Sequence, residues 1–489
     1  MTAALAIVGG ALALLVAILA VNTARFRSRQ VRVPSVEGIA VDAERCARNL
    51  ARALTFATVS HERAEGFDHA VFGAFHSFLG ETYPRVHEAL QREVVEGSSL
   101  LYTWPGSEPS LAPLVLMAHI DVVPAGEANG DDWTHPPFAG EIADGFVWGR
   151  GALDDKASLV GILEAVEALL GEGLAPRRTV YLAFGHDEEL GGWQGAAAVA
   201  TRLEELGVRA AMVLDESGVL AQGIVPQIDR PVALIGIAEK GFVSLQLEVE
   251  QEGGHSSMPP VSTAIGILAA ALARLERKPF PARMTDIARL QFDFLGPEMP
   301  LFRRLILANR WLLAPLVRSK MEQKPTTAAA LRTTMASTLI SGGEKENVLP
   351  QRACATINLR LLPGDTEETI LAHVRRAVDD PRVSLRRGGI RPRFASSVAD
   401  VESEGFTTLT RTIRELFPEA LVAPYLVLGA TDAWHYGRIS DCVLRFLPLR
   451  LTEEDLKRIH GTDERIAVDN LTEVVRFYAQ LIKGSGLDT

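Results

Sequence analysis

Residues 148–215 read WGRGALDDKASLVGILEAVEALLGEGLAPRRTVYLAFGHDEELGGWQGAAAVATRLEELGVRAAMVLD, and this stretch decides the fold class of the chain. A turn at 148–156 leads into an expected helix over 157–171, a strand over 179–184, a helix over 196–206 and a strand over 210–214. Strands that alternate with helices in this way indicate an α/β sheet, parallel or mixed, with helices on its faces. Polar residues follow the strands, and open α/β sheets carry their sites at the carboxyl ends of their strands.

The flanking sequence extends this unit and then interrupts it. Helices are expected over 41–54 and around 67–79, and a buried strand over 114–118 ends on His119. Beyond residue 241 the order becomes β-α-β-β-α-β, the split ferredoxin-like unit, over 242–250, 263–277, 333–340, 353–362, 367–378 and 383–387. The first unit resumes with a helix over 407–416, a strand over 425–428 and a C-terminal helix over 471–483. We therefore predict an apolar anchor (2–21), a linker (22–40), a first domain in two parts (41–238 and 391–489) and an inserted domain (239–390).

Within the insert, residues 280–324 are expected to be irregular. They contain LFRRLILANRWLLAPLV (301–317), which has two interpretations. It is either an additional helix packed on its neighbours, or an apolar wall or membrane-facing element that serves an apolar substrate.

The bulk composition is that of a globular protein with an acidic balance. The chain has 489 residues, 47% of them apolar and 23% charged, which favours two or three folded domains over disorder. Its net charge of −11 argues against nucleic acid as a partner, because phosphate binding needs a basic face. Only three cysteines occur (Cys46, Cys354, Cys442), so neither a disulfide framework nor a cysteine-based zinc site is expected.

The N-terminal run over residues 2–21 is uncharged and apolar. Twenty residues at about 1.5 Å each extend roughly 30 Å in a helix, which matches the hydrocarbon core of a bilayer. We predict a retained single-pass membrane anchor. The alternative, a cleaved signal peptide, is disfavoured by the length of the run and by the lack of a preceding Lys or Arg. Four arginines follow within residues 25–32. The positive-inside rule favours the cytoplasm for the residues after the anchor, but a single span without a competing loop leaves the orientation open.

Five short motifs place His, Asp or Glu where an apolar run gives way to a polar turn: MAHIDVVP (117–124), GRGALDDK (149–156), HDEEL (186–190), VLDES (213–217) and RIHGTDE (458–464). His119 and Asp121 lie two residues apart on one face of a strand. The Asp121 carboxylate can therefore hold the second imidazole nitrogen, as zinc-binding histidines prefer. Asp154 is the expected bridging ligand, because one carboxylate can give an oxygen to each of two metals. Its neighbour Asp155 is a candidate N-cap of the following helix.

The last three motifs complete a ligand set for two metals. Glu188 and Glu189 follow an apolar strand and point in different directions. One can therefore bind metal while the other moves a proton from the attacking water to the leaving amine. Asp215 or Glu216 supplies a further ligand, a choice that the sequence leaves open, and His460 closes the set. Histidine and carboxylate ligands without cysteine suit two zinc ions, with cobalt or manganese as substitutes.

On these motifs the chain resembles the aminoacylase/carboxypeptidase family of co-catalytic zinc hydrolases, in particular the branch of carboxypeptidase S and the N-fatty-acyl-amino-acid synthase/hydrolase. HIDVVP, WTHPPFAGEIADGFVWGRGALDDK, FGHDEE and IHG carry the resemblance, which extends from about residue 40 to the C-terminus. It implies an α/β zinc-peptidase catalytic domain with a mixed central sheet. It also implies that the ferredoxin-like α+β insert is a lid, through which a homodimer is expected.

The resemblance further implies a role for each residue of the five motifs. One zinc would be held by His119, Asp154 and Asp215 (or Glu216), and the other by Asp154, Glu189 and His460. Asp121 would orient His119, and Glu188 would be the general base and acid. The bond between Asp154 and Asp155 would be a cis peptide.

In the insert, the resemblance implies that His255 of GGHSS polarises the scissile carbonyl, often from the partner subunit of a dimer. Asn347 and Arg360 would bind substrate, and a guanidinium suits a free α-carboxylate. GATD (429–432) is similar to the family's substrate-site turn, but Ala433 and Trp434 depart from its usual continuation.

The expected activity is cleavage, or formation under mass action, of an amide on the amino group of an amino acid. The small-molecule substrate would be a peptide or an N-acyl amino acid, and the anchor and residues 301–317 favour a large apolar group. The alternatives are a dipeptidase or short-chain aminoacylase and, from another class, a catalytically inactive binding module. Such a module would lack a ligand, and none is missing here.

Overall fold

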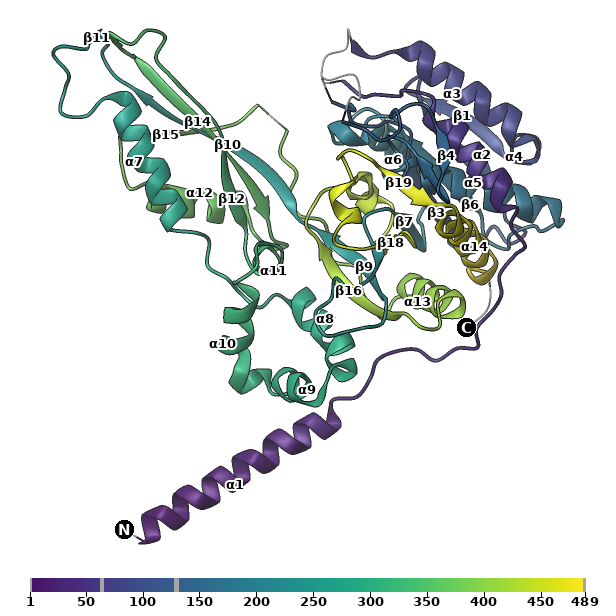
Figure 1. Cartoon of the computed structure of the whole chain (residues 1–489), viewed down its shortest axis with the longest axis horizontal. Coiled ribbons are helices and arrows are strands. Elements are labelled where there is room, and N and C mark those ends of the chain that lie inside the picture. Colours follow the sequence, from purple (N-terminus) through teal and green to yellow (C-terminus); the bar gives the residue numbers. More distant parts are fainter. Residues whose placement is uncertain (1, 62–65, 127–131, 390, 487–489) are drawn as a thin grey trace.

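The structure, a computed structural model, describes residues 2–61, 66–126, 132–389 and 391–486 (Figure 1). It has a large unit built around a ten-stranded β-sheet, a smaller unit with its own sheet, and an apolar N-terminal helix that leads away from both. Residue 390, the predicted end of the insert, and residues 487–489 at the predicted end of the first domain lie outside the described residues.

The central sheet of the large unit has ten strands and is mixed, as predicted. In its middle, β3 pairs in parallel with β6 and β7, and β7 pairs in parallel with β17. Antiparallel pairs lie on either side, between β2 and β6 and between β8 and β9. The order is β1 (Gln91–Val95), β2 (Ser99–Trp104), β6 (Val180–Gly185), β3 (Leu114–His119), β7 (Met212–Asp215), β17 (Val443–Arg445), β9 (Val232–Glu239), β8 (Val219–Ala221) and β18 (Arg450–Leu451), with β16 (Leu421–Val427) also beside β9.

Helices pack on this sheet, and the predicted ones match to within three residues at each end. α5 is buried along residues 156–167, as expected of a helix that is apolar on nearly all sides. α14 packs directly on α5: a Cβ at Gly161 would lie 2.5 Å from Val474 Cγ1, so only glycine lets the helices approach this closely. The helices of the large unit are α2 (Ala43–Leu54), α3 (His69–Thr82), α4 (Pro84–Ala89), α5 (Lys156–Gly171), α6 (Ala196–Glu205), α13 (Glu404–Leu416) and α14 (Val468–Gly484).

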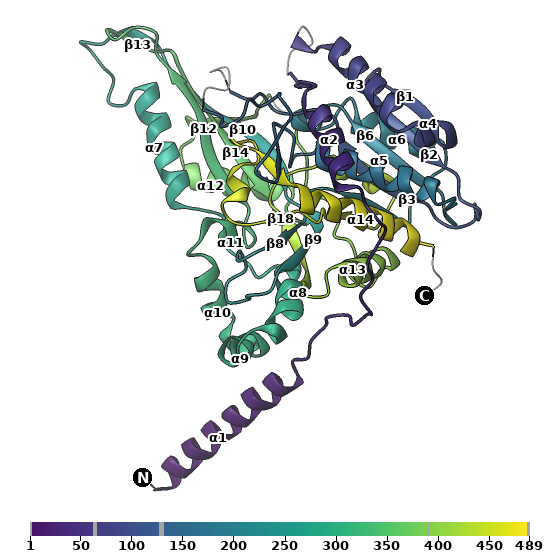
Figure 2. The ribbon, with the colours of Figure 1, turned by 45° about the vertical axis from the view of Figure 1, so that its right-hand side comes forward.

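The smaller unit has the predicted β-α-β-β-α-β order: β10 (Gly241–Glu250), α7 (Ala264–Arg277), β12 (Thr334–Gly342), β14 (Arg352–Leu361), α12 (Glu367–Val378) and β15 (Ser384–Arg387). Its strands are antiparallel and ordered β12–β14–β10–β15, and α7 packs on both α12 and the sheet. Alternate residues of β14 point into a core that is separate from the core of the large unit. A short antiparallel pair of strands, β11 (Gly254–His255) and β13 (Val348–Leu349), lies at the far tip (Figure 1, Figure 2).

The expectation that residues 280–324 are irregular is wrong, because most of them are helical. They form α8 (Asp286–Leu295), η3 (Gly296–Glu298), α9 (Leu301–Ala308) and α10 (Arg310–Met321), and α11 (Pro325–Ala329) follows. α8 packs against β16, and Ile287, Phe294 and Leu295 join the core of the large unit. Breaks at Pro300 and Asn309 interrupt the apolar periodicity, which hides these helices in the sequence.

The N-terminal helix α1 (Thr2–Arg25) is the one helix among the described residues that is long and apolar enough to cross a membrane. Its stretch Ala4–Arg25 reaches a mean hydropathy of 2.8, and none of the residues in its most apolar window is buried. Length and composition fit both a membrane span and a signal sequence. Residues 26–42 then run without helix or strand to α2.

Candidate metal centre

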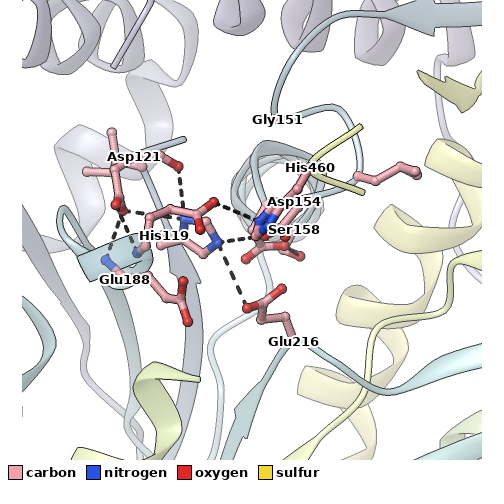
Figure 3. A network of polar contacts seen from close by, with 12 residues as sticks. His119, Asp121, Gly151, Asp154, Ser158, Glu188, Glu216 and His460 are labelled. Atoms are coloured by element: carbon pink, nitrogen blue, oxygen red, sulfur yellow. Dashed lines mark hydrogen bonds and ion pairs between the residues drawn. The ribbon is translucent and has the colours of Figure 1, made fainter. Parts of the chain in front are cut away.

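The carboxyl ends of three neighbouring parallel strands carry four of the predicted residues. His119 ends β3, Glu188 and Glu189 begin η2 (Glu188–Leu190) just after β6, and Glu216 follows β7. Since β6, β3 and β7 are adjacent, their ends meet at one edge of the sheet. Figure 3 shows Glu188 and Glu216 gathered about His119.

Two loops from distant parts of the chain bring the other ligands to this edge. β5 (Phe146–Trp148) pairs with β19 (Arg465–Ala467) and with β4 (Glu141–Ala143). GRGALDDK follows β5 and RIHGTDE precedes β19, so the pairing sets Asp154 beside His460 (Figure 3). The peptide bond between Asp154 and Asp155 is cis, as predicted. Asp155 occupies the N-cap position of α5, but its carboxylate accepts a hydrogen bond from Ser158 instead of capping the helix.

The distances divide the side chains into two groups that share Asp154. Its Oδ1 lies 2.9 Å from His119 Nε2, and Glu216 Oε1 lies 3.9 Å from the same nitrogen. Its Oδ2 lies 3.0 Å from His460 Nε2, which is also 3.2 Å from Glu189 Oε1. Tetrahedral zinc with ligand bonds of about 2.0–2.2 Å needs ligand atoms roughly 3.3–3.6 Å apart, so both groups are close to that spacing. His119, Glu188 and Glu189 form a third, overlapping group.

The geometry distinguishes Asp215 from Glu216. Glu216 belongs to one of the groups that could hold an ion, together with His119 and Asp154. Asp215 ends β7 and its Oδ2 accepts a hydrogen bond from Ala433 N, 2.8 Å away. This hydrogen bond joins β7 to the turn that follows β16.

Asp121 lies behind His119 and joins it to η2. His119 Nδ1 is 2.9 Å from the backbone oxygen of Asp121 and 3.4 Å from its carboxylate, so either oxygen can accept the ring proton. The same carboxylate accepts hydrogen bonds from the backbone N–H groups of Glu188 (3.1 Å) and Glu189 (3.2 Å). The imidazole and the two glutamates are thereby held in one arrangement.

The cluster concentrates buried negative charge. Burial, together with neighbouring carboxylates, raises the pKa values of Glu188 and Glu216 well above their ordinary range. Burial acts in the same direction on Asp154, but hydrogen bonds from His119 and His460 outweigh it and lower the pKa of that carboxyl. Glu189 Oε1 is buried, and its ion-pair partner is the ring of His460, with Nε2 at 3.2 Å. Divalent cations would neutralise these buried carboxylates, so the residues present fit a metal centre.

The smaller unit contains the other three predicted residues, His255, Asn347 and Arg360. Arg360 lies far from the first two. His255 is exposed on β11 at the tip, where Ser256 N donates to the backbone oxygen of Asn347 at 3.2 Å. Arg360 is half-buried at the opposite end of the small sheet, with its guanidinium 4.8 Å from the ring centre of Phe242. The eight residues that separate Arg360 from the tip end of β14 extend roughly 27 Å. In one chain, therefore, the tip residues and Arg360 lie at opposite ends of the sheet.

The GATD turn packs behind η2. Thr431 Oγ1 donates to the buried carboxylate of Glu239 at 3.0 Å. Asp432 is buried against Gly192, and its carboxylate accepts no hydrogen bond among the described residues. Trp434, which departs from the family's pattern, donates its indole N–H to the backbone oxygen of Phe394 at 2.8 Å.

Glu464 is a functional residue that sequence reasoning missed. It is fully buried and accepts hydrogen bonds from the Arg150 guanidinium (2.6 Å) and from the backbone N–H groups of Gly151 (3.0 Å), Leu153 (2.7 Å) and Asp154 (3.1 Å). One carboxylate thus shapes the loop that presents Asp154 and ties it to the loop of His460. Its position in RIHGTDE, four residues after His460, was the available signal.

Comparison with known proteins supports these observations. The chain matches Peptidase family M20/M25/M40 over residues 115–484, a range that includes every residue of the cluster. It is 41% identical over 480 residues to probable carboxypeptidase S-like 2 of Dictyostelium discoideum, covering 96% of this chain and 91% of the relative. It is 41% identical over 426 residues to the N-fatty-acyl-amino acid synthase/hydrolase PM20D1 of Xenopus tropicalis, covering 85% of this chain and 81% of the relative. To carboxypeptidase S of Saccharomyces cerevisiae it is 30% identical, covering 84% and 78%.

Solved structures share the fold at lower identity. An M20 family metallo-carboxypeptidase from Sulfolobus solfataricus matches with a TM-score of 0.64 at 17% identity, covering 90% of this chain and 99% of that one. Human carnosine dipeptidase 1 matches with a TM-score of 0.62 at 16% identity, covering 91% and 96%. The length of the family match and the identity to the curated relatives lead to one assignment: this chain belongs to Peptidase family M20/M25/M40 and is a metallopeptidase/amidohydrolase.

Proposed function

We propose that the protein is a membrane-anchored di-zinc hydrolase that cleaves, or under mass action forms, the amide bond to an amino acid with a free carboxylate. The observation that carries this proposal is the pair of ligand groups that share Asp154, with Glu188 beside them. A shared carboxylate between two sets of histidine and carboxylate ligands is the arrangement that a two-metal hydrolase needs.

Each metal would be held by one of the two groups. His119, Asp154 and Glu216 would hold one zinc, and Asp154, Glu189 and His460 the other. Asp215 is the less suitable ligand because its carboxylate binds Ala433 N. Imidazole and carboxylate without thiolate favour zinc, and cobalt or manganese would be substitutes. Bound zinc would polarise the scissile carbonyl and make water a better nucleophile at neutral pH.

Glu188 is the proposed general base and acid. Its carboxylate would take a proton from the attacking water and deliver it to the departing amine nitrogen, so that the amine leaves neutral. Asp121 would serve as a positioning residue, because its carboxylate holds the backbone of Glu188 and faces the ring of His119. Burial, followed by the neighbouring carboxylates, raises the pKa of Glu188, and a raised pKa makes this carboxylate a stronger proton acceptor than an ordinary glutamate.

The smaller unit (239–390) is proposed as a lid and dimerisation domain between the two parts of the catalytic domain (41–238 and 391–489). His255 and Asn347 lie at its tip, whereas Arg360 lies near its base. A homodimer would let His255 and Asn347 of the partner subunit act at this site, where Arg360 would bind the free α-carboxylate of the substrate.

The proposed substrates are N-acyl amino acids with long apolar acyl chains, in preference to polar dipeptides. Two observations support this choice: the similarity to a protein named N-fatty-acyl-amino acid synthase/hydrolase, and the apolar helix α1, which would retain the enzyme at a membrane. Each methylene that the site buries would contribute about 0.8 kcal/mol to binding. Peptides with a free C-terminus are the second substrate class, favoured by the similarity to carboxypeptidase S.

A hydrolysis screen of the purified full chain tests the proposal. The substrates are the N-oleoyl and N-acetyl forms of one amino acid, the N-oleoyl amino acid amide, and a dipeptide with a free C-terminus, each with and without chelator. We expect the highest kcat/KM for the N-oleoyl amino acid, a large loss for its amide, two zinc equivalents per chain, and no activity after chelation. A preference for the N-acetyl form would favour a short-chain aminoacylase, and full activity in metal-free protein would contradict the proposal.

A further inference from the structure

Helices α9 and α10 carry five large apolar side chains on their surface. The exposed fractions are 72% for Leu301, 71% for Phe302, 62% for Trp311, 43% for Leu312 and 46% for Leu316. These five residues are called the apolar patch below. A soluble surface rarely leaves this many large apolar side chains together without a partner.

The carboxyl end of α1 is fixed to these two helices at Asn309, which joins α9 to α10. Asn309 is fully buried, and its side chain donates to the backbone oxygen of Leu19 (3.2 Å) and accepts from the side-chain amide of Asn22 (3.0 Å). Arg304 donates to the backbone oxygen of Phe26 at 2.7 Å, one turn beyond. The last two turns of α1, and the residue just after it, are therefore joined to α9 and α10 by specific hydrogen bonds.

The linker after α1 fixes the large unit to the same place. The side-chain amide of Gln30 donates to the backbone oxygen of Val422 (2.9 Å) and accepts from the backbone N–H of Val422 (2.8 Å), so it fixes the linker to β16. The guanidinium of Arg29 lies 4.6 Å from the ring centre of Phe294 on α8. α1, α8–α10 and the central sheet are thus held in one relative orientation.

This orientation places α9 and α10, which carry the apolar patch, where α1 would leave a bilayer. The 22 residues of Ala4–Arg25 extend about 33 Å, close to the thickness of the hydrocarbon core. The contacts at Leu19 and Asn22 lie at the carboxyl end of this span. Figure 1 and Figure 2 both show α1 leaving the molecule directly from α9, with α10 next to it and the rest of the protein on the far side.

The charges around the apolar patch suit an anionic lipid surface. Residues 301–321 contain five basic and no acidic side chains, and four more arginines lie within residues 25–32, although the chain as a whole has a net charge of −11. Arg310 pairs with Asp293 and Arg318 with Glu322, whereas Lys320 is exposed at the end of α10. Tryptophan beside basic residues is typical of the membrane–water interface.

We infer that α9 and α10 form a second membrane contact, in which the apolar patch inserts among the lipid chains next to the point where α1 emerges. This inference rests on the proposed membrane anchoring by α1. The partner is an anionic phospholipid bilayer. The contact would fix the orientation of the catalytic unit relative to the membrane surface. An amphipathic helix pair that lies in the interface plane binds in this way.

Fluorescence quenching by lipid tests the contact, because Trp311 is the only one of the six tryptophans in α1 or α8–α10. The full chain is reconstituted in vesicles of equal parts phosphatidylcholine and phosphatidylglycerol, with acyl chains brominated near the headgroup. We expect part of the emission to be quenched in the wild type and this quenching to be lost in Trp311→Phe. Leu312→Ser with Leu316→Ser should weaken the quenching of Trp311, whereas the control Leu206→Ser, 50% exposed at the end of α6, should not.

Flotation of the same samples distinguishes membrane anchoring by α1 from the second membrane contact by α9 and α10. Wild type that floats with the vesicles, with Trp311 unquenched, would overturn the second contact and leave the anchor standing. The patch would then be covered by a second copy of the chain or used by the acyl group of the substrate. Wild type that fails to float would overturn the anchor and the second contact together, while chelator-sensitive hydrolysis would still stand on the metal cluster.

Discussion

Replacing Glu464 with alanine should release the loop that presents Asp154. The lost carboxylate accepts hydrogen bonds from Arg150 and from three backbone N–H groups of the loop at residues 151–154. Three of these four contacts are buried, and the one from Asp154 N is partly buried. Because the same guanidinium also donates to the backbone oxygens of His460 (3.3 Å) and Gly461 (3.0 Å), the His460 loop should loosen as well.

The magnitude follows from burial. The Arg150 side chain is 3% exposed and Glu464 is fully buried, so the substitution leaves a charge without its counter-ion in the interior. Removing one partner of a buried ion pair costs about 3–5 kcal/mol, a large part of the roughly 5–15 kcal/mol that stabilises a typical domain. Glu464→Gln keeps the shape and one acceptor oxygen, so it should lose less stability than Glu464→Ala.

Denaturant unfolding in detergent and zinc analysis of the full chain measure both effects. We expect Glu464→Ala to lower the free energy of unfolding by about 3 kcal/mol or more and to lower zinc content, because Asp154 is shared by both ligand groups. The control is Glu172→Ala, which breaks an ion pair with Lys483 (2.9 Å) whose side chains are 50% and 32% exposed. Such a pair should contribute less than about 1 kcal/mol. Wild-type stability and zinc content in Glu464→Ala would refute the reasoning.

The remaining predictions concern the cluster and the substrate. Glu188→Gln should retain zinc and lose about 10²–10⁴-fold in kcat, since it removes the proton carrier, and a near-normal kcat would exclude that role. His119→Ala should lose one zinc and Asp154→Ala both, as measured by metal analysis; the loss of only one zinc from Asp154→Ala would mean that Asp154 is not shared. Arg360→Lys should raise KM for a substrate with a free carboxylate and change that for its amide little, because an ammonium cannot replace the two-pronged guanidinium contact. Equal effects on both substrates would contradict carboxylate binding.

The sequence predicts those helices and strands that are encoded by their own residues, through caps and apolar periodicity. α12 is predicted at its observed bounds, residues 367–378, because Thr366 caps it and its apolar residues recur at helical spacing. β17 is different. It has only three residues, Val443–Arg445, and becomes a strand by pairing with β7 and β9 far away in the sequence. No local pattern encodes such a pairing.

The same limit applies to the candidate site. The histidines and carboxylates are visible in the sequence because each lies in a motif at the end of an apolar run. The difference between Asp215 and Glu216 is not visible, since Asp215 is held by Ala433 N, 218 residues further along the chain, whereas Glu216 lies with His119 and Asp154. Glu464 was missed because three of its four partners are backbone N–H groups, which every residue except proline has.

The central position of β17 determines when the enzyme can become active during its synthesis. This strand joins β7 to β9 in the middle of the sheet, and His460 follows it. Translation proceeds from the N-terminus, so the ribosome must make almost the whole chain before the two halves of the sheet can be connected. Until then strand edges in the nascent protein stay open, and open edges invite aggregation. A stop codon ahead of β17 would therefore yield a polypeptide that can neither complete its sheet nor bring His460 to the ligand cluster.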